Sequence, residues 1–335
     1  MRSPNKVARL LLAFVVGSTV FADYWEYSRV YHANPDWWMD VLRGTADAPQ
    51  QYRIGVPWVA DLLRRHGHMG LRHGLTLIDL VCAVVAVSLL FSVFEHSRVY
   101  RAASETARWF GAAAFVFLIQ FYFAWITWYQ RPETMASTAV VAATLWLLTV
   151  RLPLPGTAAT VVASAAMVVL AGVQGFIRPD VIFAVHLGVL VVCLTRSGDG
   201  FVLARGAQAA TSAAAVLVAG GIQYTLMHLV YPHAGYGTTR VFELVQNLTN
   251  PLGWVPFVLF LLPWSWLVTS LIRRRARAEV PGLALVAGSA IYMAMWFVVG
   301  RIEEVRIFLP FAVGLTPLTC VCAMERWADA QRRFA

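Results

Sequence analysis

Runs of apolar residues about as long as a bilayer is thick are the feature that most constrains this chain. A helix rises about 1.5 Å per residue, so roughly 20 apolar residues cross the hydrocarbon core of a membrane. Such runs recur along the 335 residues, and the short stretches between them hold almost all of the charge. Hydrophobic side chains make up 59% of the sequence and charged ones 13%, which is more apolar content than a soluble core can bury. The chain is therefore expected to be an integral membrane protein.

The runs predict an all-α fold, a polytopic helical membrane bundle of about ten transmembrane helices, because no alternating strand pattern appears. Residues 1–335 are expected to form a single integral membrane domain. The expected spans are 7–24, 75–94, 109–128, 135–150, 156–176, 181–195, 207–227, 254–272, 281–299 and 307–324. The basic N-terminus before an apolar run ending at Ala22 also resembles a cleavable signal peptide, although an uncleaved first helix is favoured.

The arginines and the single lysine predict the orientation. With the N-terminus in the cytoplasm, 16 of the 27 basic residues fall in cytoplasmic segments and 5 in short outer loops, as the positive-inside rule expects. The other 6 lie in the long segment 25–74, where the rule is weak. Both termini are thus expected on the cytoplasmic side of a cell inner membrane. Topology accounts for the formal charge of +9, so membrane lipids and not nucleic acid are the expected partners.

The segment 25–74 is the one sizeable stretch predicted outside the membrane. Asn34-Pro35 before Asp36 and Trp38, with Gly44 behind, gives the cap, first-turn proline and terminating glycine of a short helix. Pro57 opens a second amphipathic stretch. Both are expected to lie in the membrane interface, anchored by tryptophan, as interfacial helices of the first outer loop.

Neither a metal site nor a disulfide framework is indicated. The four cysteines all lie inside apolar runs, and the loosely grouped histidines of 66–73 lack a fourth ligand at a recognisable spacing. No cofactor is expected, although the sequence leaves a divalent metal open. Asp79 and His186 fall within expected spans, where an ionisable group is costly and a functional candidate, but each also suits a reading as an ordinary helix-end or core residue.

Three predicted outer loops combine arginine with a carboxylate just before a span. They are Arg131-Pro132-Glu133, Arg178-Pro179-Asp180, and the group Arg301, Glu303, Glu304 and Arg306. Proline followed by an acid is ordinary helix-start chemistry, but a cation at a helix N-terminus is unfavourable unless it has another partner. The arginines therefore imply something anionic. Phosphate is one candidate, since guanidinium binds it bidentately, and mutual salt bridges between the loops are the other.

Two acids mark the expected end of the first span. Asp23 and Glu26 are spaced three apart and would share one face of a continued helix, so they could line a cavity at the membrane surface. A helix that has simply reached water is the alternative.

These elements together resemble the GT-C class of integral-membrane glycosyltransferases and its uncharacterised bacterial relatives. The resemblance rests on the acid after the first span, the interfacial helices, Tyr52-Arg53-x-x-x-Pro57, the arginine-proline-acid loops and the run from Glu303 to Pro310. It implies sugar transfer from a polyprenyl-phosphate-linked donor to an unknown acceptor at the extracytoplasmic face. Asp23 would be the general base, supported by Glu26. The substrate-binding residues would be Arg53, Arg131, Glu133, Arg178, Asp180, Glu303 and Arg306.

The sequence departs from that class in lacking an adjacent Asp-Asp or Asp-Glu pair, a large periplasmic domain and more than about ten spans. Two other functions stay open. A transporter or flippase for a lipid or small solute would also use intramembrane charge, and the repeated arginine-proline-acid element hints at an internal repeat. A non-catalytic partner in a cell-envelope complex is the third possibility.

Overall fold

The computed structural model of the protein describes residues 6–33, 37–125, 133–195, 200–236, 242–273, 280–302 and 304–334. Throughout these ranges the regular secondary structure is helical. The helices are α1 (Lys6–Ala33), α2 (Trp37–Arg43), η1 (Gln50–Tyr52), α3 (Gly55–Gly67), α4 (Leu71–His96), α5 (Arg98–Ala102), α6 (Glu105–Trp125), α7 (Glu133–Thr149), α8 (Gly156–Gly175), α9 (Pro179–Thr195), α10 (Arg205–Thr225), η2 (Leu226–Val230), α11 (Leu244–Thr249), α12 (Pro251–Arg273), α13 (Val280–Val299), η3 (Val305–Phe308) and α14 (Leu309–Phe334).

The all-helical fold is confirmed, and each expected span overlaps one of these helices. Within the described residues, five segments are long and apolar enough to cross a membrane, as a membrane-embedded protein requires. They are α4, α8, α10 with η2, α13, and η3 with α14. Helices α7 and α9 are apolar but only 17 residues long. A total of about ten spans therefore stays a prediction.

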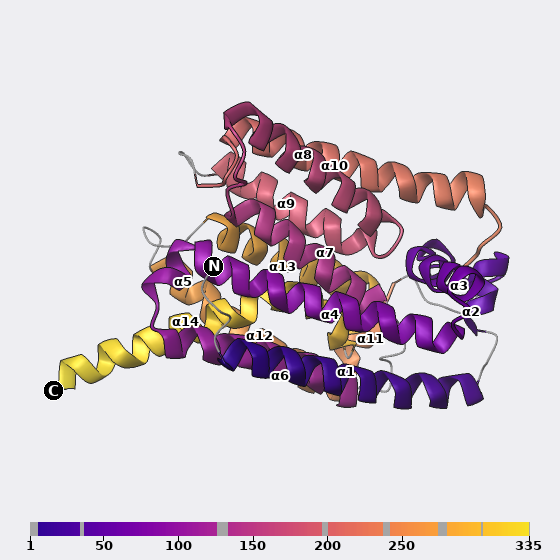
Figure 1. The fold of residues 1–335 in the computed structure, drawn as a ribbon, viewed down its shortest axis with the longest axis horizontal. Helices are drawn as coiled ribbons and strands as arrows, with labels where there is room; N and C mark the ends of the chain where they lie inside the picture. Colours follow the sequence, from indigo (N-terminus) through magenta and orange to yellow (C-terminus); the bar gives the residue numbers. More distant parts are fainter. Residues whose placement is uncertain are drawn as a thin grey trace.

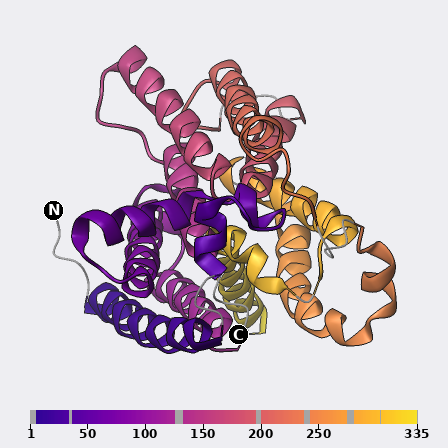
Figure 2. The same ribbon diagram turned by 90° about the vertical axis from the view of Figure 1, so that its right-hand side faces the viewer.

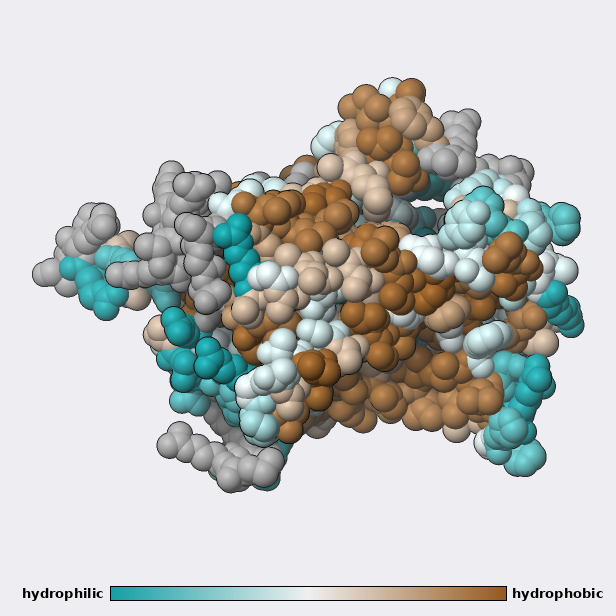
Figure 3. Space-filling view, turned by 90° about the horizontal axis from the view of Figure 1, so that it is seen from above, coloured by the Kyte–Doolittle hydropathy of each residue, from teal (hydrophilic) through white to brown (hydrophobic). Residues whose placement is uncertain are grey.

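The long helices run side by side along the longest dimension of the molecule (Figure 1). Helix α1 begins and α14 ends toward one end of this bundle, whereas α2 and α3 lie at the opposite end, called here the α3 end. Figure 2 looks onto the α3 end. A broad band of hydrophobic residues covers the middle of the face seen in Figure 3, with hydrophilic residues toward both ends, which is the pattern expected of a bundle solvated by lipid.

Small residues bring α9 and α13 into close contact. A Cβ added to Gly188 would lie 2.3 Å from the carbonyl oxygen of Ala284, and one added to Gly288 would lie 2.6 Å from that of Ala184. Ala184 and Gly188 are four apart on α9, as are Ala284 and Gly288 on α13. This small-x-x-x-small spacing on both partners is typical of helix packing in membranes, where close backbone approach replaces the hydrophobic drive available in water.

The predicted first outer loop, residues 25–74, forms both expected short helices, with different boundaries. Helix α1 continues past the expected end of its span to Ala33, and α3 begins at Gly55 and not at Pro57. Gly44 ends α2 as predicted, with the positive φ of 79° that glycine adopts without strain. Trp38 of α2 packs inward and is 4% exposed, so it does not anchor that helix in the interface. The side chain of Trp37 lies outside the described part of the structure.

Candidate functional site

Hydrogen bonds from backbone, tyrosine and glutamine groups hold the segment 52–55 onto the tips of other helices at the α3 end. The amide N–H of Gly55 donates to the carbonyl of Phe176 at 2.9 Å, and the Tyr52 hydroxyl donates to the carbonyl of Ala234 at 2.8 Å. Gln223 of α10 donates through Nε2 to the carbonyl of Gly175 at 2.6 Å and to that of Tyr52 at 3.3 Å. These contacts place Arg53 beside the segment that joins α8 to α9.

A buried ion pair occupies the start of α9. Arg178 Nη2 lies 2.5 Å from Asp180 Oδ2 and 2.6 Å from the hydroxyl of Tyr292, which reaches across from α13. That hydroxyl donates to Asp180 Oδ2 at 2.9 Å, so the three groups close a triangle. Arg178 is 1% exposed, and its guanidinium carbon lies 5.6 Å from the ring centroid of Trp296. The arginine is thus held by an anion, a hydroxyl and an aromatic face.

A second ion pair joins the first loop to α7. Arg53 Nη1 lies 3.4 Å from Glu133 Oε1, and both side chains are mostly buried. The two pairs influence each other, since Arg53 acts electrostatically on Asp180 and Glu133 acts on Arg178. We call Arg53, Glu133, Arg178, Asp180 and Tyr292 the ion-pair cluster. It brings four of the predicted substrate-binding residues together from three separate stretches of the chain.

The electrostatics of the cluster are balanced. Burial alone lowers the pKa of the Arg178 guanidinium, but Asp180, then Tyr292 and Glu133, raise it above the ordinary arginine value. Two guanidinium groups face two carboxylates, so the cluster carries little net charge when all four are ionised. Gln174 adds a hydrogen bond from Nε2 to the carbonyl of Arg178 at 3.1 Å and contacts the hydroxyl of Ser137 on α7.

The other predicted site residues lie outside the ion-pair cluster or outside the described residues. Arg306 is buried in η3 and pairs with Glu304 at 3.0 Å. In the same turn, the ring of Phe308 packs 5.5 Å from that of Tyr292. Arg131 and Glu303 lie outside the described residues. Asp23 and Glu26 lie on one continuous helix, α1, as their spacing predicted, but their side chains are outside the description.

The ion-pair partners of the arginines bear on whether these residues bind phosphate or form salt bridges. Arg178 and Arg306 each have a carboxylate two residues away, and Arg53 pairs between the first loop and α7. Arg178 and Arg306 are thus paired within their own loops, and Glu133 pairs with Arg53, which lies outside the three arginine–carboxylate loops. Their role in binding a substrate stays a prediction.

Sequence reasoning missed Tyr292, Gln174 and Gln223. All three lie in apolar helices, and a lone polar residue there reads as an ordinary core position. The available signal was the cost of a buried hydroxyl or amide in a membrane bundle, which implies a polar partner on another helix.

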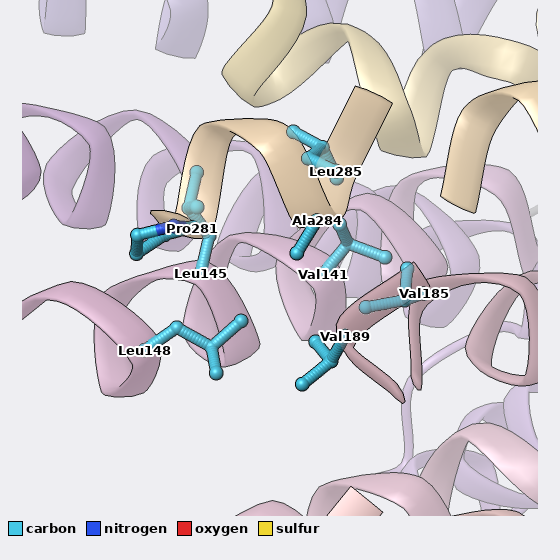
Figure 4. Close-up of a pocket in the computed structure, with 8 residues that line it drawn as sticks. All are labelled: Val141, Leu145, Leu148, Val185, Val189, Pro281, Ala284 and Leu285. Carbon is cyan, nitrogen blue, oxygen red and sulfur yellow. The ribbon is translucent and has the colours of Figure 1, made fainter. Parts of the chain in front are cut away.

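Other polar and hollow features lie apart from the cluster. His186 is fully buried in α9, with Nδ1 3.2 Å from the hydroxyl of Ser212, which agrees with its reading as a hydrogen-bonded core residue. A small pocket between α7, α9 and α13 has an entirely apolar lining, which includes Leu148, Val189 and Pro281 (Figure 4). It lies at the far end of α7 from Glu133 and offers no polar group for chemistry.

No family model, curated protein or solved structure matches the chain significantly. Within the described residues, no group of three or more histidine, cysteine, aspartate or glutamate side chains could hold a metal ion.

Proposed function

We propose that the protein is a GT-C-like glycosyltransferase that moves a sugar from a polyprenyl-phosphate-linked donor to an acceptor at the extracytoplasmic membrane face. The observation that supports this is the ion-pair cluster, which gathers arginines and carboxylates at one end of an apolar bundle. A donor with a lipid tail and a charged phosphate needs such a boundary between lipid and water. The acidic residues of α1 lie in the part of that helix that runs toward the same end (Figure 1).

We propose different tasks for the two arginines of the cluster. Arg178 is fully enclosed and engaged by Asp180 and Tyr292, so it positions its neighbours and cannot readily reach a ligand. Arg53 keeps 14% of its side chain exposed, and its contact with Glu133 is a single long one of 3.4 Å. A guanidinium has five N–H donors, so Arg53 retains donors for the phosphate of the donor lipid.

In the proposed transfer, the acceptor oxygen forms a bond to the anomeric carbon while the bond from that carbon to the phosphate oxygen breaks. The acceptor proton passes to a carboxylate, for which Asp23 is our assignment with Glu26 in support, and the polyprenyl phosphate leaves with the negative charge. Arg53 would stabilise that charge as it develops. General-base catalysis of this kind contributes roughly 10²- to 10⁴-fold to the rate.

Purified protein in lipid nanodiscs, supplied with radiolabelled polyprenyl-phosphate hexoses and extracted envelope acceptors, tests the proposal. We expect sugar transfer that falls about 10²- to 10⁴-fold in Asp23→Asn. Arg53→Gln should weaken donor binding, measured as the donor concentration that protects the protein from thermal unfolding. Arg43→Gln is the matched control, since Arg43 lies on α2 in the same loop, is 56% exposed and pairs only loosely with Asp40.

Two results would contradict the proposal. Absence of both turnover and protection with every polyprenyl-phosphate sugar would remove the donor class. Full turnover in Asp23→Asn together with Glu26→Gln would remove the α1 carboxylates from the mechanism.

A further inference from the structure

Helix α3 turns apolar side chains away from the protein although it is not one of the membrane-crossing helices. Trp58, Val59 and Leu62 are 59%, 49% and 57% exposed. On the opposite side Val56 and Ala60 are buried, and α3 packs there against the start of α4. Helix α3 is therefore already packed against the protein through its buried side, and its exposed apolar side faces outward in the folded structure.

The structure distinguishes α3 from α2, although the sequence predicted the same role for both. Helix α2 directs Trp38 and Val41 into the protein, and both are buried. Only α3, among the described parts of the first outer loop, presents a large aromatic residue together with aliphatic ones to the surroundings.

Basic residues border this apolar face. Asp61 accepts contacts from Arg64 at 2.8 Å and from Arg65 at 2.6 Å, and its own carboxylate is 8% exposed. The two arginine side chains are 44% and 65% exposed. One enclosed carboxylate thus faces two accessible guanidinium groups, which leaves a net positive charge on α3. Leu62 and Arg65, three residues apart, share one side of the helix.

We propose that the exposed face of α3 binds the lipid surface, with Trp58, Val59 and Leu62 among the upper acyl chains and Arg64 and Arg65 on the phosphates of anionic lipids. Two observations favour lipid over a protein partner. Helix α3 packs directly on the start of α4, which is long and apolar enough to cross a membrane and has Val81 and Val85 51% and 39% exposed along its length. Helix α3 is also seen nearly end-on in Figure 1, so its axis runs across the bundle, as an interfacial helix requires. The proposal does not depend on the proposed function.

Spin labels in vesicles test the depth of this face. Single-cysteine variants with a nitroxide at Leu62→Cys, Phe117→Cys and Gln331→Cys are compared for collision with oxygen, which partitions into lipid, and with a water-soluble nickel chelate. Phe117 is 71% exposed on the apolar helix α6, and Gln331 is exposed on the part of α14 that projects from the bundle. We expect values at Leu62 between these two references. A Leu62 label that behaves like the Gln331 label would overturn the proposal.

Lipid charge tests the arginines. Adding phosphatidylglycerol to phosphatidylcholine vesicles should lower nickel access at Leu62 and leave the Phe117 and Gln331 references unchanged. Arg64→Gln with Arg65→Gln should abolish that response, whereas Asp61→Asn, which removes the opposing carboxylate, should enlarge it. Equal responses in the three proteins would refute the role of charge.

A photoreactive amino acid at Leu62 gives a second measurement that keeps all four native cysteines. Crosslinks to phospholipid in native membranes are expected. Crosslinks to a protein chain without any to lipid would show that another protein covers this face, and would overturn the proposal.

Discussion

The close approach of α9 and α13 predicts an unusual sign for a glycine substitution. Gly188→Ala should destabilise the protein even though alanine is the better helix former. The added Cβ would lie 2.3 Å from the carbonyl oxygen of Ala284 and 2.5 Å from the amide nitrogen of Gly288. Both are backbone atoms, so no flexible side chain can move aside to accommodate the methyl group.

The magnitude follows from two opposing terms. Alanine is favoured over glycine by about 1 kcal/mol within a helix. Forcing one extra carbon into a packed contact costs about 1–3 kcal/mol, and backbone displacement places this case toward the upper part of that range. The two helices form the most extensive contact between elements in the described structure, so separating them also weakens their other contacts. We expect a net loss of about 1–2 kcal/mol.

Unfolding in mixed micelles of mild and denaturing detergent measures the change, and Gly221→Ala is the matched control. Gly221 lies inside α10, and a Cβ there would meet nothing within 4 Å. Its substitution should therefore be neutral or stabilising. Loss of stability in both variants, or in neither, would contradict the packing argument.

The remaining predictions concern the buried charges and the orientation. Arg178→Gln should cost about 3–5 kcal/mol, because it leaves a carboxylate without its cation in a buried site, whereas Arg332→Gln, which breaks an exposed pair, should change the free energy of unfolding by less than about 1 kcal/mol. A similar cost for both would refute the importance of burial. Tyr292→Phe keeps the ring but removes the hydroxyl shared by the ion pair, so the same unfolding assay should show a loss of about 1–3 kcal/mol, and an unchanged midpoint would contradict that hydrogen bonding. Impermeant thiol reagents on sealed cells should label Thr45→Cys and not Gln331→Cys, and the reverse pattern would invert the predicted topology and with it the site argument.

The local sequence pattern was enough to predict where the long apolar helices of this protein lie. Every expected span overlaps a helix, because a continuous apolar segment that must satisfy its own backbone hydrogen bonds has little choice but to be helical. Predicted boundaries were less accurate within the segment 25–74, as at Ala33 and Gly55, because polar residues there can continue a helix or end it. The number of membrane spans and the orientation of the protein depend on its placement in the membrane, and both remain predictions.

The sequence by itself determined an all-helical, apolar chain with arginines and acids confined to a few loops, because composition and residue period act within each segment. Only the tertiary structure decided which of those charges meet. Arg53 and Glu133 are 80 residues apart, and the partner of Arg178 on α13 is 114 residues away. No local pattern encodes such pairings, since they depend on how the helices are arranged in space. Small residues allow the close contact of α9 with α13, and a backbone hydrogen bond docks the first loop on Phe176. These two contacts fix the arrangement that brings the charges together.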